Sequence, residues 1–280
     1  MNHTGTISLI ILLANFIFSY KGFANRAFFE RYSFEIERVL VFREYRRLIT
    51  SGFLHVSWSH FLFNMISLLA FCFLLEKGLG SIQFCSIYFG SLLTGNLLSL
   101  LIHRHDSDYS SVGASGAICG VIFATIAIYP GISISIMGLL AIPGWLYGLF
   151  FVLISVYGIK SRQDNIGHDA HLGGALAGML IALFFEPHAI WQNFTTILAI
   201  SIPCLFFIYI IITRPYLLLV DNLFYRKHHN FANIDHRYNF ERANKQKELD
   251  MLLEKIHTKG INSLSKAERE RLEQYSQEMN

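Results

Sequence analysis

The chain has 280 residues, of which 53% are hydrophobic, 15% aromatic and only 15% charged. This composition, with a mean hydropathy of +0.41, excludes an ordinary soluble domain and indicates a polytopic membrane protein. A formal net charge of +3 without a basic run excludes nucleic acid as a partner.

The apolar segments predict seven membrane spans, since roughly 20 apolar residues cross a bilayer. The first span is expected to be retained, because no basic residue precedes it as in a signal peptide. The predicted spans are at about 7–23, 56–75, 82–102, 112–129, 143–159, 170–187 and 194–213. We therefore predict an all-α fold, a polytopic membrane helical bundle.

Three segments that connect the predicted spans differ from them in composition, and each suggests a structure. Residues 24–54 are rich in arginine and aromatics, which suits amphipathic helices in the headgroup region. Residues 130–142 are apolar and are expected to form a membrane-embedded connector or an extension of the fifth span. Residues 76–80 predict a turn that separates the second and third spans.

The charged carboxyl-terminal residues predict a water-exposed tail. Leu249, Leu252, Leu253 and Ile256 have helical spacing, and Ser265 with Glu268 forms a capping-box pattern that opens a second short helix. Two interpretations of this tail stand side by side: a helical hairpin that binds a partner, and a weakly folded tail. We predict three parts: a membrane core over 1–190, a further transmembrane helix over 191–215 and this helical tail over 216–280.

Strongly polar side chains inside spans are costly unless paired, so each is a functional hypothesis. The second span opens with His55, His60 and Asn64, the fourth with Ser115 and the sixth with His171. Because consecutive spans alternate in direction, these three spans begin on the same side of the membrane. We expect their polar side chains to meet in a pocket sunk below one membrane face.

Small residues around Ser115 allow two interpretations. A serine among glycines can be a helix-packing residue, or its hydroxyl can attack a peptide carbonyl. The attack needs a base, for which His171 is suited, and donors aimed at the oxyanion, for which His60, Asn64 and the Ser115 backbone N–H are candidates. The glycines at 116, 120, 174 and 178 would let the fourth and sixth spans approach closely enough for a hydrogen bond between Ser115 and His171.

A third catalytic residue is not evident. Asp169 is two residues before His171, about 200° round a helix, and cannot orient that imidazole. We therefore predict a Ser-His dyad, and expect His168 and Asp169 to be residues at the surface end of the helix without a role.

Three motifs stand in register at membrane-helix spacing. They are His55-x4-His60-x3-Asn64, Gly113-Ala114-Ser115-Gly116 and Ala170-His171-x2-Gly174-x3-Gly178. With these motifs, in the family's order on its second, fourth and sixth spans, residues 7–187 resemble the rhomboid intramembrane serine proteases. The segment Glu44-Tyr45-Arg46-Arg47-Leu48-Ile49-Thr50 also resembles the family's first loop.

The resemblance implies a six-helix core and an intramembrane serine endopeptidase that cleaves peptide bonds in or near transmembrane segments. Ser115 would be the nucleophile, and His171 would act first as base and then as acid. The resemblance gives supporting roles to further residues: oxyanion stabilisation to His60 and Asn64, and site architecture to His55 and Gly113. Two positions depart from the family's pattern, since Arg46 stands where tryptophan is usual and Cys119 where many relatives pack an aromatic on the base.

Two alternatives belong to other classes. His55, His60, His168 and His171 could form a histidine metal cage in a transporter or metalloenzyme, although no H-E-x-x-H motif is present. An inactive rhomboid-like chaperone would lack the serine or the histidine, and both are present. The four cysteines lie in apolar runs without a C-x-x-C pair and are expected to be packing residues, so neither a metal nor a cofactor is predicted.

The expected setting is the lipid bilayer, in a multi-pass protein of a bacterial cytoplasmic membrane, with transmembrane proteins as substrates. The oligomeric state is open. The orientation in the membrane is open as well. Family analogy predicts that the site opens on the side away from the cytosol. The arginines of residues 26–47 lie on the side where the site opens, and by the positive-inside rule they would place that side in the cytosol.

Overall fold

A computed structural model describes residues 5–107, 109–136, 140–161 and 167–213, together with Leu252, Lys255, Ile256 and Ser265. The chain divides into two compact units, Met1–Phe224 and Tyr225–Asn280. Apart from the four single residues, the predicted tail helices lie outside the described residues. The three-part division predicted above stays a prediction.

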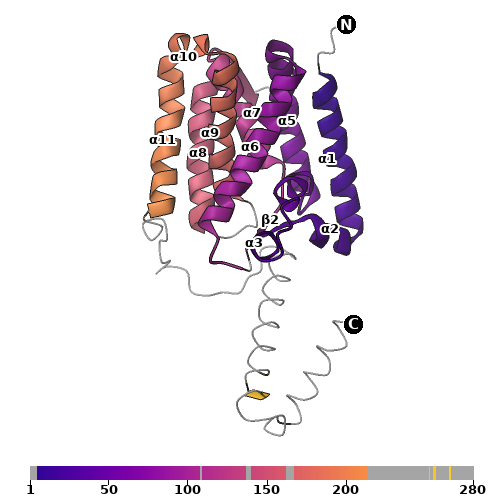
Figure 1. Cartoon of the computed structure of the whole chain (residues 1–280). Helices are drawn as coiled ribbons and strands as arrows, with labels where there is room; N and C mark the ends of the chain where they lie inside the picture. The colour runs from indigo at the N-terminus through magenta and orange to yellow at the C-terminus, as the bar shows by residue number, and fades with distance from the viewer. Residues whose placement is uncertain are drawn as a thin grey trace. The chain divides into compact units, whose positions relative to one another are not determined.

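Helices make up most of the described part of the first unit (Figure 1). The long helices are α1 (Thr6–Ala24), α5 (Trp58–Leu79), α6 (Ser81–Ile102), α7 (Ser115–Ile128), α8 (Gly144–Ser161), α9 (His168–Phe185) and α11 (Phe194–Thr213). The short elements are α2 (Arg26–Tyr32), β1 (Phe34–Glu35), α3 (Ile36–Leu40), α4 (Arg47–Thr50), η1 (Ser51–Phe53), β2 (Ser110–Ser111), β3 (Ser133–Ile136), β4 (Leu140–Pro143) and α10 (His188–Gln192).

The predicted all-α membrane bundle is confirmed. Among the described residues, α1, α5, α6, α9 and α11 are long and apolar enough to cross a membrane. Helices α5, α7 and α9 begin at the same end of the bundle, next to α3 and β2 (Figure 1). This shared end is the one where the sequence predicts a polar pocket.

Helix α7 is shorter than the predicted span of residues 112–129. Its 14 residues measure about 21 Å at the usual rise, less than the roughly 30 Å of a bilayer core. Twelve of them, Gly116 to Ala127, are buried, so the other helices surround α7. Helix α7 is therefore a central helix that begins inside the bundle and not at its end, and Ser115 is its first residue.

Small residues bring α7 and α9 into backbone contact. A side chain at Gly174 would overlap the Gly116 carbonyl, and one at Gly178 would overlap the Gly120 backbone. The close approach predicted for these helices is therefore present, and it decides how near Ser115 and His171 can come.

The predicted turn at 76–80 is wrong in one respect, because helix α5 continues through Glu76 to Leu79. Glu76 is buried and accepts hydrogen bonds from the Ser8 amide at 2.9 Å and from the hydroxyls of Ser8 and Ser81 at 2.6 and 2.7 Å. These bonds satisfy the carboxylate inside the helix end and tie α1 to the junction of α5 and α6. The chain reverses at Gly80, whose φ of 101° favours glycine.

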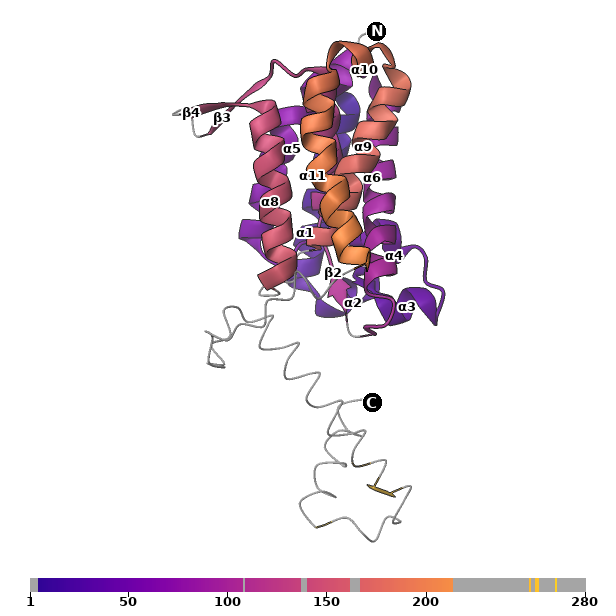
Figure 2. The same cartoon turned by 90° about the vertical axis from the view of Figure 1, so that its left-hand side faces the viewer.

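The apolar connector 130–142 is not a helical extension of the fifth span, and its embedding in the membrane stays a prediction. It forms an antiparallel hairpin of β3 and β4, with Ser133 opposite Pro143 and Ile136 opposite Leu140, which extends sideways from the end of α8 (Figure 2). The sequence explains the change: Pro130-Gly131 ends one helix, and alternating Ser and Ile residues suit a strand better than a helix.

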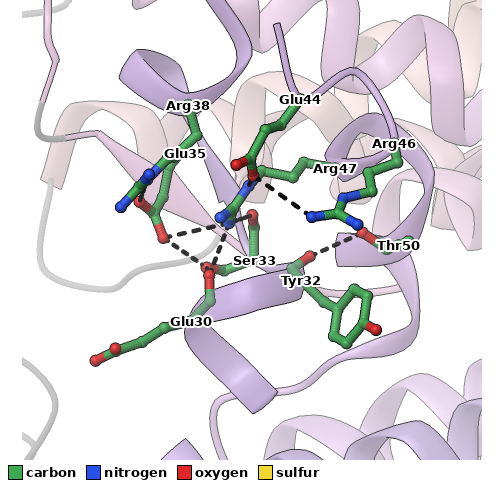
Figure 3. A network of polar contacts seen from close by, with 9 residues as sticks. All are labelled: Glu30, Tyr32, Ser33, Glu35, Arg38, Glu44, Arg46, Arg47 and Thr50. Carbon is green, nitrogen blue, oxygen red and sulfur yellow. Dashed lines mark hydrogen bonds and ion pairs between the residues drawn. The ribbon is translucent and has the colours of Figure 1, made fainter. Parts of the chain in front are cut away.

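The arginine-rich connector folds around one buried guanidinium (Figure 3). Arg47 is 4% exposed and donates to Glu44 Oε2 at 2.6 Å and to the carbonyl oxygens of Glu30 and Ser33 at 2.7 Å each. The hydrogen bond from Arg47 is the main cause that lowers the pKa of the Glu44 carboxyl. Arg46, at the family's tryptophan position, instead lies at the edge, 6.0 Å from the Tyr32 ring.

We expect Arg47→Gln to destabilise the protein by about 3 kcal/mol, because it leaves buried acceptors and a carboxylate without their cation. The matched control is Arg46→Gln, whose side chain is half exposed and should change stability little. Thermal unfolding of both variants in the same detergent measures the difference. Equal shifts would contradict the central place of Arg47 in this network.

Candidate active site

A serine and a histidine meet between the helices, near the end of the bundle where α7 and α9 begin. The Ser115 Oγ lies 2.7 Å from His171 Nε2, from the first turn of α7 to the first turn of α9. For the hydroxyl to donate, Nε2 must be unprotonated, so the proton of the neutral imidazole then sits on Nδ1. The structure therefore brings together the two residues on which the predicted dyad rests.

The start of α7 adds backbone donors beside the hydroxyl. Ala114 is the N-cap and supplies no side-chain hydrogen bond, and Ile118 N is the first amide bonded back to Ala114 O. The amides of Ser115, Gly116 and Ala117 therefore have no intrahelical acceptor, and the positive end of the helix dipole lies at the Ser115 side chain.

Gly113 borders both Ser115 and His60. Its φ of 138° favours glycine, and a Cβ there would lie 3.0 Å from His60 Cε1 and 3.4 Å from Ser115 Oγ. A side chain at residue 113 would enter the space between the His60 imidazole and the Ser115 hydroxyl. Glycine at residue 113 keeps this space free of a side chain, and its role in the architecture of the site stays a prediction.

Asn64 follows His60 by one turn on the same face of α5. It is 4% exposed, and its Nδ2 has no hydrogen-bond partner among the residues that the structure describes. A buried amide donor without an acceptor is uncommon, and it suits a group that binds an oxygen of a substrate.

His55 is fully buried and lies just before the start of α5. Ser19 Oγ donates to Phe53 O at 3.0 Å and is 2.7 Å from His55 Nδ1, so with its own proton used the hydroxyl accepts from Nδ1–H. Burial, with a smaller effect of His60, lowers the pKa of His55 to about 3. His55 is therefore neutral at ordinary pH, with its ring 5.0 Å from that of His60.

His168 and Asp169 lie at the start of α9, as predicted, but they are buried and not at the surface, which corrects the prediction. His168 is 8% and Asp169 3% exposed. Asp169 accepts from the Tyr109 hydroxyl at 3.2 Å and is 3.5 Å from His103 Nε2. Burial raises the pKa of Tyr109 well above its usual value, so this phenol is a donor. The carboxylate faces away from the dyad, as its helical position predicts.

A small cavity lies beside the dyad. It measures about 10 Å³ and is lined by Ser51, Asn96, Ser111 and Ser115 among others. This is about the volume that one water molecule needs, and the lining offers several polar partners. Asn96 was not singled out from the sequence. The same signal that identified Asn64, an asparagine inside an apolar span, is present at Asn96 in the third span.

The histidine-cage alternative does not fit these positions. Among the residues that the structure describes, no three His, Cys, Asp or Glu side chains are grouped so that they could hold a metal ion. The cysteines are all free, and three of the four are buried, as expected of packing residues.

The fold and this site define a multi-pass integral membrane protein with a serine-histidine pair buried between its helices. A family model described as "Rhomboid domain" matches residues 43–188, more than half of the chain. The chain belongs to the rhomboid family. A second model, "Family of unknown function (DUF6576)", matches residues 232–278 in the tail.

Similar proteins come from bacteria and from eukaryotes, mitochondrial ones among them. The chain is 36% identical over 147 residues to the putative rhomboid protease YdcA of Bacillus subtilis, covering 50% of this chain and 66% of the relative. It is 33% identical over 144 residues to the mitochondrial rhomboid protein 1 of Saccharomyces cerevisiae (50% and 41%) and 32% identical over 139 residues to the rhomboid protease GluP of Bacillus subtilis (50% and 26%). The matches thus span less than two thirds of these relatives.

Proposed function

We propose that this chain is an intramembrane serine endopeptidase that works through a Ser115-His171 dyad. The observation that carries the proposal is the 2.7 Å contact between Ser115 Oγ and His171 Nε2 in a site surrounded by apolar helices. Two relatives named as rhomboid proteases support the reaction class.

In the first step the Ser115 hydroxyl gives its proton to His171 Nε2 while Oγ forms a bond to the peptide carbonyl carbon. The carbonyl oxygen becomes an oxyanion. The amide N–H of Ser115, the Asn64 amide and the His60 ring are proposed to stabilise it, since preorganised donors in a site shielded from water are worth several kcal/mol.

In the second step His171 returns the proton to the leaving amine, and the peptide bond breaks to leave an ester on Ser115. A water molecule then attacks the ester, and His171 takes a proton from it and gives that proton to Ser115 Oγ as the ester bond breaks. The cavity lined by Ser51, Asn96 and Ser115 is the proposed place of that water. The products are a new carboxylate, a new amine and the free serine.

The substrates are proposed to be transmembrane proteins, cleaved in or near their membrane segments. Because Ser115 lies at the start of the short central helix α7, a scissile bond has to unwind from helical structure and enter the bundle to reach it. A bacterial cytoplasmic membrane is the proposed location.

Chemical modification of the purified full-length protein tests the nucleophile without a known substrate. A fluorophosphonate, which reacts covalently with activated serines, should modify Ser115 and no other serine when the peptides are mapped by mass spectrometry. A reporter with one transmembrane segment should be cleaved in liposomes, and a chelator should not affect the rate. An unmodified Ser115 in folded protein would contradict the proposal, and inhibition by the chelator would favour a metalloenzyme.

A further inference from the structure

An aromatic ring from α8 lies against the imidazole of the dyad. The ring centroids of Phe151 and His171 are 5.6 Å apart with an interplanar angle of 45°. The position four residues after Ser115, on α7, is occupied by Cys119, which is buried but has no ring. The ring beside the base therefore comes from a different helix.

A second aromatic ring, from α7, packs against Phe151. Its ring packs edge-on against Phe123 of α7, with centroids 6.3 Å apart and an angle of 74°, and Phe123 is fully buried. Tyr147 and Ser155 lie one turn before and one turn after Phe151, on the same face of α8. Phe151 thus belongs to the face that α8 turns toward the bundle, whereas its neighbour Phe150 is 51% exposed.

The imidazole has a second ring neighbour. His168 meets His171 edge-on, with centroids 5.1 Å apart. A Cβ at Gly158 of α8 would overlap the His168 ring, so this ring is pressed against the α8 backbone. Helix α8 therefore limits the imidazole directly through Phe151 and indirectly through His168.

We propose that Phe151 is a positioning residue for the general base, holding the His171 ring in the orientation in which Nε2 faces Ser115 Oγ. This inference rests on the proposed function. Because the Asp169 carboxylate is engaged with Tyr109 and His103, ring packing takes over the orienting task that a carboxylate has in a catalytic triad. A tilted aromatic contact of this kind fixes a ring without adding charge.

Three variants test the inference in the full chain. Phe151→Leu removes the ring and keeps an apolar side chain, and Phe151→Tyr keeps the ring. Phe150→Leu is the matched control on the exposed side of the same helix. We expect Phe151→Leu to lower kcat about 10- to 100-fold with little change in KM, because a misplaced base slows proton transfer and leaves binding intact. Phe151→Tyr and Phe150→Leu should stay within about twofold of the original protein.

The readouts are the kinetics of reporter cleavage, the rate of fluorophosphonate modification of Ser115 and the Tm of each variant. Should Phe151→Leu not fold, Phe151→Met fills the same space with a flexible chain and takes its place. The inference is overturned if the ring-free variant keeps its kcat, or if its loss equals that of Phe150→Leu. If the original protein neither cleaves the reporter nor is modified at Ser115, the proposed function itself fails, which is a distinct outcome.

Discussion

Ser115→Ala is expected to abolish cleavage of a transmembrane reporter, with a loss of at least about 10⁴-fold in kcat. Without the hydroxyl no ester can form, and what remains is binding and the polarisation of the carbonyl by the donors. The substitution removes one oxygen at a helix start and leaves the glycine contacts of α7 unchanged, so the Tm should stay close to that of the original protein. The measurement is cleavage in liposomes beside a thermal unfolding curve.

The matched control is Ser86→Ala. Ser86 is a half-buried serine on α6 whose hydroxyl donates to its own helix at Ile82 O, so activity should be unchanged. His171→Ala should match the loss of Ser115→Ala, and the double variant should be no worse, because the members of a catalytic unit are not additive. Cleavage retained by Ser115→Ala would rule out the serine mechanism.

The sequence could predict those site residues whose polar side chains lie inside apolar spans, because burying a polar group there costs free energy. His60, Asn64, Ser115 and His171 stand out because polar groups inside apolar spans are expensive, and the alternation of spans places them at one end. The cost argument also explains the error at Asp169: two residues at a helix start were taken to face water, whereas His103 and Tyr109 arrive from elsewhere in the chain to meet the carboxylate.

What could not be predicted depends on contacts between distant segments. Arg47 resembles its neighbour Arg46 in the sequence, and only the fold shows that backbone carbonyl oxygens of residues 30 and 33 surround one of them. Phe151 is one of many aromatics in apolar spans, so no local pattern distinguishes it from Phe150. The late start of α7 arises because the chain before it pairs as β2 with β1, through Phe34 and Ser111.

Gly174→Val is expected to lower stability and activity together. A side chain at residue 174 would overlap the Gly116 carbonyl, and backbone atoms cannot rotate away as a side chain does. Helices α7 and α9 must then move apart, which strains the packing by about 1–3 kcal/mol.

The separation would act on the reaction as well as on the fold. His171 lies one turn from residue 174 and Gly116 follows Ser115, so the displaced backbones are those that carry the dyad. A misplacement of about 1 Å can reduce a rate about 100-fold. Tm, cleavage rate and fluorophosphonate modification should therefore all fall in Gly174→Val, whereas Leu180→Ile, at a 62% exposed position on the same helix, should change none of them. A variant that loses stability but keeps its modification rate would show that the spacing of α7 and α9 serves the fold alone.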